Sequence, residues 1–273
     1  MRLILVCLIF ALISAVSIAQ DLPSRDDYER ILIPIAPNRP TPGAYGSLWK
    51  AVLSLRNVGD QPSEVFHSFE IFHCIGIIIL CEPGAPLQPQ TTATTLDSQD
   101  LGTIFATIGA AERGPGALMH IERETASNIF FDLLLHELTT ADQNQGTHLP
   151  VVRESELFDR PIELLNISTR EMARARLRLY ALPTPTLPWL RIEMYPLKGS
   201  ELLGEVTLAL TPDVRQNFPH YAEVVLDAPF FSPPASHDWV RLRISPLNSG
   251  FKYWGFVSLT NNETQLVSII TPQ

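Results

Sequence analysis

Cysteine is scarce in this chain of 273 residues, and the motifs of several enzyme classes are missing. Of the three cysteines, Cys74 and Cys81 are spaced too widely for the C-x-x-C motif of thiol–disulfide oxidoreductases. No G-x-S-x-G motif surrounds a serine, so the nucleophile elbow of α/β-hydrolases is not indicated. Carboxylate pairs for glycoside hydrolysis need not be close in sequence, and nothing singles one out. We therefore predict no catalytic residue, no cofactor and a protein that is not an enzyme.

Metal-binding motifs are missing as well. His136-Glu137 begins an H-E-x-x-H motif, but no histidine follows at its last position. Asp142–Gly146 resembles the start of a calcium loop, but Arg153 stands where the twelfth-position glutamate is needed. His67, His73 and Cys74 are the remaining candidates for a metal site, and a disulfide at Cys74 would remove its thiolate. No metal site is predicted.

Positive charge is also in short supply. The chain has 20 Lys and Arg against 29 Asp and Glu, a formal net charge of −9. This balance argues against nucleic acid or an anionic membrane surface as a partner. Long apolar runs are limited to the N-terminus, so no membrane span is predicted in the rest of the chain.

The N-terminus has the three parts of a signal peptide. Arg2 supplies the positive charge, Leu3–Ile13 is the apolar segment, and Ser17-Ile18-Ala19 provides small residues for cleavage. We expect cleavage after Ala19, with residues 1–19 removed and the chain secreted or periplasmic. In such an oxidising compartment, Cys74 and Cys81 are expected to form a disulfide.

Proline is abundant, at 23 residues, and separates many short segments that alternate between apolar and polar side chains. Three segments alternate clearly and predict half-buried strands, namely Leu48–Arg56, Ala173–Ala181 and Trp239–Ser245. Ser127–Leu138 fits either a capped helix or a strand that is buried on both faces, and its neighbours favour the strand. The sequence therefore predicts an all-β protein.

The final segments, Tyr253–Leu259 and Gln265–Ile270, are predicted to form a hairpin around Asn261-Asn262. A two-residue loop would place Phe256 opposite Val267. Both faces of this hairpin are apolar, so we expect it to lie in the centre of its sheet.

A polar stretch at Thr139–Val152 is predicted to be a hinge between two β-rich halves. The expected domains are residues 27–140 and 149–273, each an antiparallel β-sandwich. Their openings, Ile31–Asn57 and Leu149–Asn166, are weakly similar, which suggests duplication of one module.

Several segments resemble uncharacterised secreted bacterial proteins with tandem immunoglobulin-like sandwiches. The matching segments are P42-G-A-Y-G-S-L-W49, the Cys74/Cys81 pair, G146-T-H-L-P-V-V152, W254-G-F-V-S-L-T-N-N-E-T-Q265 and T271-P-Q273. The resemblance covers nearly all of the chain after residue 19. It implies two immunoglobulin-like antiparallel β-sandwiches in tandem after a cleaved signal peptide, and it implies no function.

Two features are candidate recognition sites. A Cys74–Cys81 disulfide would fold the intervening chain back and expose Ile77, Ile78 and Ile79 as an apolar contact loop; the alternative is a buried strand with two thiols. Arg174, Arg176 and Arg178 lie on one side of a predicted strand as a basic row for an acidic partner. The alternative is a solvated face on which these charges sit across from Glu193 or Glu205.

We accordingly expect a non-catalytic exported binding or structural module that acts through protein–protein or cell-surface contacts. The alternatives are a periplasmic two-domain assembly chaperone and a carbohydrate-binding module. A groove with two carboxylates and Trp49, Trp189, Trp239 or Trp254 would indicate the carbohydrate-binding class, but we expect these tryptophans to be packing residues.

Overall fold

The computed structural model describes residues 25–34, 40–66, 86–94, 116–139, 146–211, 219–226 and 238–273. These ranges are built from strands and contain no α-helix, so the predicted all-β class is confirmed. Across them, no helix has the length and apolar character needed to cross a bilayer. Short 3-10 segments are η1 (Arg25–Asp27), η2 (Ala44–Gly46), η4 (Ala126–Asn128) and η5 (Glu154–Glu156). The predicted signal peptide, residues 1–19, lies outside these ranges.

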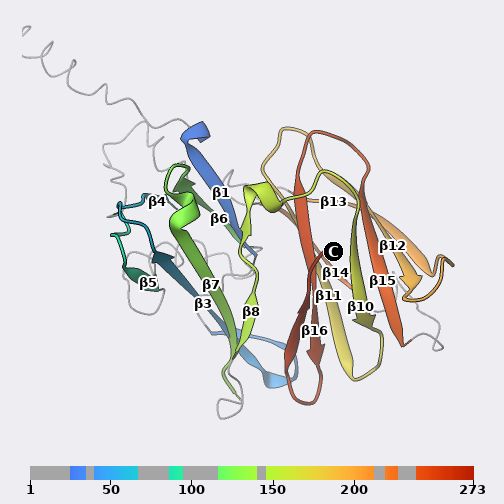
Figure 1. Ribbon diagram of the computed structural model, residues 1–273. Helices are drawn as coiled ribbons and strands as arrows, with labels where there is room; N and C mark the ends of the chain where they lie inside the picture. The colour runs from blue at the N-terminus through green and yellow to red at the C-terminus, as the bar shows by residue number, and fades with distance from the viewer. Residues whose placement is uncertain are drawn as a thin grey trace, which may run out of the picture.

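Two antiparallel sheets form a first lobe, coloured blue and green in Figure 1. One has the strand order β4-β6-β1-β9 and the other β2-β3-β7-β8, with β5 paired to β3. The strands are β1 (Tyr28–Ile33), β2 (Thr41–Pro42), β3 (Leu48–Asn57), β4 (Val65–Phe66), β5 (Thr92–Thr94), β6 (Ala117–Glu122), β7 (Ile129–Glu137), β8 (Thr147–Leu149) and β9 (Val152–Arg153).

A second lobe, coloured yellow to red in Figure 1, contains two further antiparallel sheets. Their strand orders are β10-β15-β12-β13 and β14-β11-β16-β17. The strands are β10 (Ile162–Ser168), β11 (Ala173–Ala181), β12 (Trp189–Pro196), β13 (Gly204–Ala209), β14 (His220–Val225), β15 (Trp239–Pro246), β16 (Tyr253–Asn261) and β17 (Val267–Ile270).

Alternation along the strands builds one hydrophobic core in each lobe. In β3, Ala51, Leu53 and Leu55 are buried against the first-lobe strands, as the sequence predicts. In β12, every second residue from Leu190 to Met194 is buried in the second core. Because side chains of a strand point alternately to its two faces, this alternation turns one face of β3 and one face of β12 toward a core.

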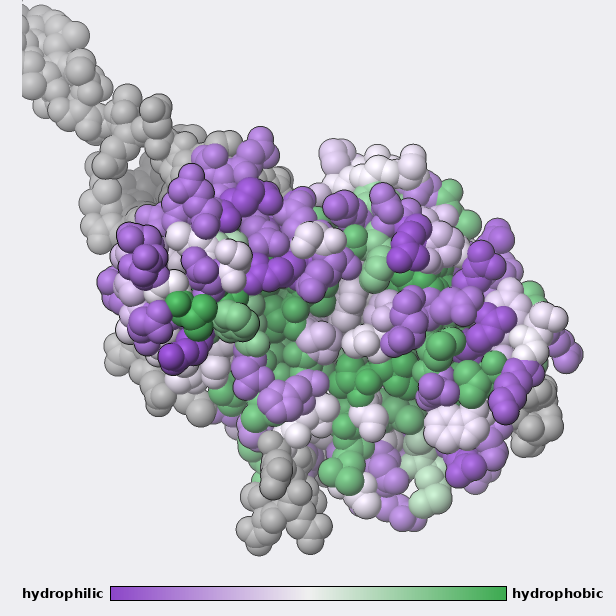
Figure 2. Space-filling model, viewed as in Figure 1, coloured by the Kyte–Doolittle hydropathy of each residue, from purple (hydrophilic) through white to green (hydrophobic). Residues whose placement is uncertain are grey.

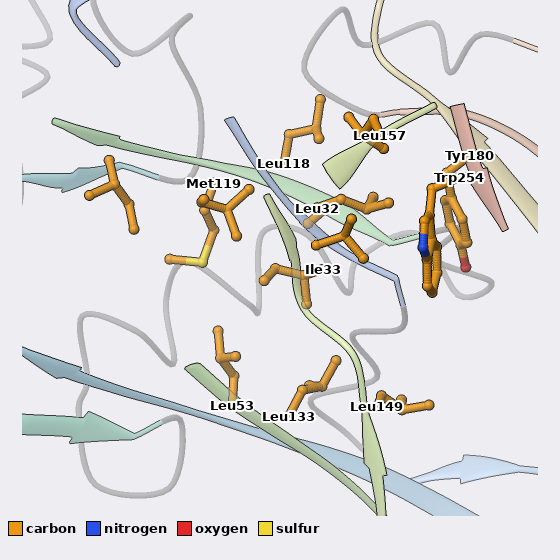
Figure 3. Packing of buried hydrophobic residues seen from close by; sticks show 14 of the residues in the cluster. Leu32, Ile33, Leu53, Leu118, Met119, Leu133, Leu149, Leu157, Tyr180 and Trp254 are labelled. Carbon is orange, nitrogen blue, oxygen red and sulfur yellow. The ribbon is translucent and has the colours of Figure 1, made fainter. Parts of the chain in front are cut away.

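The sheet β14-β11-β16-β17 packs on both faces. One face supplies residues such as Leu177 and Val257 to the second core. From the other face, Tyr180, Trp254 and Phe256 join the core of the first lobe. Figure 3 shows Tyr180 and Trp254 beside Leu32 and Ile33 of β1. The two lobes therefore share a packed apolar junction.

The predicted hinge at Thr139–Val152 is wrong for its described C-terminal part. Leu149 of β8 pairs with Leu133 of β7, and Val152 of β9 pairs with Leu32 of β1. Leu149 and Val152 are both buried in the first-lobe core. The predicted start of the second domain, residue 149, therefore lies in a first-lobe strand. Ser127–Leu138 is mainly strand, as favoured, with η4 preceding β7.

The predicted register of the last hairpin is also wrong. Val267 pairs with Thr260 rather than with Phe256. The turn is longer than two residues, because the Asn261 side chain accepts hydrogen bonds from the backbone N–H groups of Glu263 and Thr264, at 2.9 Å each. Asn and Asp side chains often organise turns in this way. β16 is interior to its sheet, whereas β17 is at the end of the strand order.

Candidate functional site

Two predicted site features fall on residues that the structure does not describe. Cys74 and Cys81, with their expected disulfide, and the contact loop at Ile77, Ile78 and Ile79 lie outside the described ranges. Their roles stay predictions. Two surfaces of the second lobe lie within the described ranges. One is the predicted basic row on β11, and the other is the outer face of the β10-β15-β12-β13 sheet.

The basic row lies on the face of β11 that points toward the first lobe. Arg174, Arg176 and Arg178 share this face with Tyr180, which packs in the first-lobe core. The row therefore begins beside the apolar junction at Tyr180 and extends away from it toward Arg174. Along this one strand, the face changes from an aromatic side chain to charged side chains.

Glu223 on β14 neutralises the middle of the row. Its carboxylate lies 2.7 Å from Arg176 Nη1 and 3.1 Å from Arg178 Nε. Tyr221 donates its hydroxyl hydrogen bond to the same carboxylate at 2.9 Å, and Arg178 donates to Ser258 Oγ at 2.8 Å. The predicted partners across from the row, Glu193 and Glu205, are wrong because these residues lie on β12 and β13 of the other sheet.

The pKa values of this network follow from burial and charge. Burial by itself would raise the pKa of Glu223, but the charge of Arg178 and the hydrogen bond from Tyr221 outweigh it, and the pKa is lowered. Burial raises the pKa of Tyr221, and the charge of Glu223 raises it further. At neutral pH the network is therefore ionised at Glu223 and neutral at Tyr221.

Arg174, at the far end of the row, links the two lobes. Its Nη2 donates to Gln265 Oε1 at 3.0 Å, and its guanidinium carbon lies 4.9 Å from the ring centre of Tyr45 in η2. Burial lowers the pKa of Arg174, although the guanidinium group stays charged at physiological pH. All three arginines thus have partners within the chain, which makes the row chiefly a structural element of the lobe junction.

The four tryptophans divide into two buried or bonded residues and two exposed ones. Trp254 lies in the junction, and Trp49 donates its indole hydrogen bond to Ser47 Oγ at 2.9 Å. Trp189 is 43% exposed and Trp239 is 42% exposed. The expectation that the tryptophans are packing residues is therefore wrong for Trp189 and Trp239.

Both exposed tryptophans lie on the outer face of the β10-β15-β12-β13 sheet. Trp189 alternates along β12 with buried residues such as Leu190, and Trp239 does so along β15 with Val240. Trp239 begins the same alternation as Arg241 and Arg243, so the sequence pattern already contained the signal that it points outward.

Charged and aromatic side chains lie between the two tryptophans. Arg241 lies 3.1 Å from Glu163, and its guanidinium carbon is 4.4 Å from the ring centre of Tyr195. Arg191 lies 3.5 Å from Glu205 on β13. The outer face therefore combines Trp, Tyr and Arg with nearby carboxylates in a sheet whose backbone is fixed by a buried core.

Metal chemistry finds no support in the described residues, which contain no group of three or more His, Cys, Asp and Glu side chains able to hold an ion. The buried carboxylate Glu137 is used locally, since it accepts hydrogen bonds from the backbone N–H groups of Leu48 and Thr139, at 3.0 Å each. The side chains of the two described surfaces can stack, form hydrogen bonds and pair with charges.

The comparisons with known proteins add no relative. No protein-family model matches the chain, and no curated protein or solved structure matches it significantly. Figure 2 shows that hydrophobic residues also reach the surface in the middle of one face, where the two lobes meet.

Proposed function

We propose that this chain is a non-catalytic exported binding module that contacts a protein of the cell surface or envelope. The binding surface is the outer face of the β10-β15-β12-β13 sheet. We also propose that residues 1–19 direct export and that the two lobes are tandem immunoglobulin-like sandwiches. The all-β fold and the two separate cores support that arrangement.

The observation that carries the proposal is the exposure of Trp189 and Trp239 on one face, together with Tyr195, Arg191 and Arg241. Tryptophan, tyrosine and arginine are the residues most enriched among those that dominate binding energy at protein interfaces. Large aromatic side chains that stay exposed at two positions of one face favour a binding role for that face.

The test is capture of a partner from the culture medium or periplasm of the source organism, followed by measurement of its affinity. We expect the double variant Trp189→Ala/Trp239→Ala to weaken binding at least about tenfold, because large aromatic side chains at an interface are worth over 1 kcal/mol each. Phe130→Ala is the matched control, since Phe130 is an exposed aromatic residue on β7 of the other lobe. Equal binding by the double variant and the wild type would refute this face.

A carbohydrate-binding module is the second candidate, and the same exposed tryptophans favour it because indole rings stack on sugars as well as on proteins. Retardation of the wild type in gels that contain a soluble polysaccharide, lost in the double variant, would favour this class.

The chaperone class is favoured by a different observation, since Arg174, Arg176 and Arg178 face the other lobe. A partner lost on Arg176→Ala but retained by Trp189→Ala/Trp239→Ala would indicate that class.

A further inference from the structure

The outer edge of β13, as the described part of the chain shows it, differs from the other sheet edges of the second lobe. Beside β17, Thr147 of β8 donates its hydroxyl hydrogen bond to the Val267 carbonyl at 3.1 Å. Beside β14, Thr211 forms an isolated bridge with Tyr221. Beside β10, the backbone N–H of Gln273 donates to the Glu163 carbonyl at 3.1 Å. Within the described ranges, no strand or bridge pairs with the side of β13 that faces away from β12.

The backbone groups on this edge can be assigned from the neighbouring ladder. Leu210 donates its backbone N–H to the Pro188 carbonyl at 2.9 Å, so it points toward β12. In an antiparallel sheet, alternate residues direct their N–H and C=O groups to opposite sides of the strand. Glu205, Thr207 and Ala209 therefore direct theirs away from β12.

β13 also lacks the features that usually protect an edge. Natural edge strands are commonly blocked by proline, by lysine or by an inward-pointing charge. Gly204–Ala209 contains no proline and no lysine, and its inward side chains are Val206 and Leu208, which pack against the second core. Among the described residues nothing protects this edge of six residues, which makes it a template for pairing with another strand.

A second copy of the same strand fits this edge. In an antiparallel pair centred on Thr207, Thr207 faces Thr207 of the second copy, and Glu205 faces Ala209. Val206 faces Leu208 on the inner side. All outward backbone groups then meet outward backbone groups, which gives about six interchain hydrogen bonds. No like charges are opposed in this register, whereas a pair centred on Glu205 would oppose two carboxylates.

We infer that the chain forms a two-fold symmetric dimer in which β13 strands of two copies pair antiparallel about Thr207. The two four-stranded sheets join into one continuous sheet, and their outer faces lie side by side. The symmetry is that of most homodimers, in which one self-complementary patch serves both subunits. The inference does not depend on the partner of the outer face, although a dimer would present that face twice and increase avidity.

Sedimentation of the purified chain over a concentration series tests the dimer. We expect the wild type to dimerise and Thr207→Pro to be monomeric, because proline removes an outward N–H without removing a bond to β12. Thr207→Val is the matched control, since it keeps the N–H and the branched shape. A wild type that stays monomeric, or a Thr207→Pro variant that dimerises like the wild type, would overturn the inference.

Charge at position 209 gives a second test that does not depend on how Thr207→Pro folds. In the proposed register, Ala209→Glu faces Glu205 of the other copy and Ala209→Lys faces the same carboxylate. We expect at least about tenfold weaker dimerisation for Ala209→Glu than for Ala209→Lys, because like charges directly opposite each other repel. Equal dimerisation of the two variants would contradict the register.

Cross-linking checks the centre of the pair. Facing residues with two ladder hydrogen bonds have Cα atoms about 5.5 Å apart, within the range of a disulfide. Thr207→Cys should therefore form a covalent dimer under mild oxidation. Glu205→Cys should not, since the two positions 205 are offset by about four residues, or ~13 Å. The wild type, with its own cysteines, is the background control, and efficient cross-linking through position 205 instead of 207 would disprove this register.

Discussion

Tyr180 of the second lobe donates its hydroxyl hydrogen bond to the backbone carbonyl of Pro34 in the first lobe. The Tyr180 side chain is 1% exposed, and its ring lies 6.5 Å from that of Trp254 and 6.4 Å from that of Phe256. Burial raises the pKa of Tyr180 well above its ordinary value, so the hydroxyl keeps its proton and remains a donor. One side chain thus supplies both apolar area and a specific polar link between the lobes.

Tyr180→Phe should destabilise the chain by about 1–2 kcal/mol, because it removes the hydrogen bond and leaves the buried Pro34 carbonyl without that donor. The ring and its stacking remain. Urea denaturation of the two proteins measures the difference. Tyr195→Phe provides a comparison, since the Tyr195 hydroxyl donates to Glu193 on the outer face rather than to a buried carbonyl. Unchanged stability in Tyr180→Phe would mean that this link contributes nothing.

Glu223→Ala should cost about 1–3 kcal/mol, because it leaves Arg178 without its carboxylate partner. The Arg178 side chain is only 17% exposed, and removing one member of a largely buried pair is more costly than removing an exposed one. Glu201→Ala, in an exposed loop, removes the same charge and should change stability by less than about 0.5 kcal/mol. Thermal denaturation compares them, and equal losses would show that the network adds no stability.

Much of the fold was predictable where one face of a strand is buried. β3 and β15 alternate between apolar and polar residues, and the structure buries the predicted side of each. On β11 the structure buries Leu177 and Leu179 on the predicted side, but it also buries Tyr180 on the other side. A one-residue shift would expose every apolar side chain of such a strand, so burial fixes its orientation. The strand at β7 was harder, because a continuous apolar run has no period to distinguish it from a helix.

The relation between the lobes was not predictable from local patterns. The outward arginines of β11 resemble a solvated face, and nothing near them in the sequence shows that Tyr180 is covered by residues about 150 positions earlier. Leu149 and Val152 lie in a polar stretch, yet their burial completes the first-lobe core. The hairpin register failed for a smaller reason, since the Asn261 side chain organises a longer turn than the expected one.

Acid should weaken the chain partly through Glu154. Burial alone would raise the pKa of this residue, but its hydrogen bonds and ion pair with Arg30 outweigh burial and lower it. A lowered folded-state pKa contributes stability that is present above the unfolded value, about 4.3, and is lost as the pH falls through the folded value. Between pH 5 and pH 3 the wild type should therefore lose more stability than Glu154→Gln.

At pH 7, Glu154→Gln should be about 1 kcal/mol less stable than the wild type, since the partly buried pair is broken. Denaturant titrations of both proteins at a series of pH values give the comparison. If the two stability curves run parallel from pH 7 to pH 3, the pair with Arg30 is not the source of the acid sensitivity.

Gly255→Ala should destabilise the chain more than an alanine usually does in a strand. A Cβ at position 255 would lie 2.6 Å from Leu179 Cδ2 and 2.8 Å from the Arg178 carbonyl oxygen of β11. The Leu179 side chain lies in a packed core and has little room to move, and the carbonyl oxygen belongs to the backbone. Neither group can therefore move away easily from the added Cβ. We expect a loss of about 1–3 kcal/mol from overpacking. Ser268→Ala, at the exposed position of β17, is the control, and thermal denaturation of both variants should show a lower midpoint for Gly255→Ala alone. An unchanged midpoint would mean that β11 and β16 accommodate the added Cβ without cost and that their packing around Gly255 is not tight.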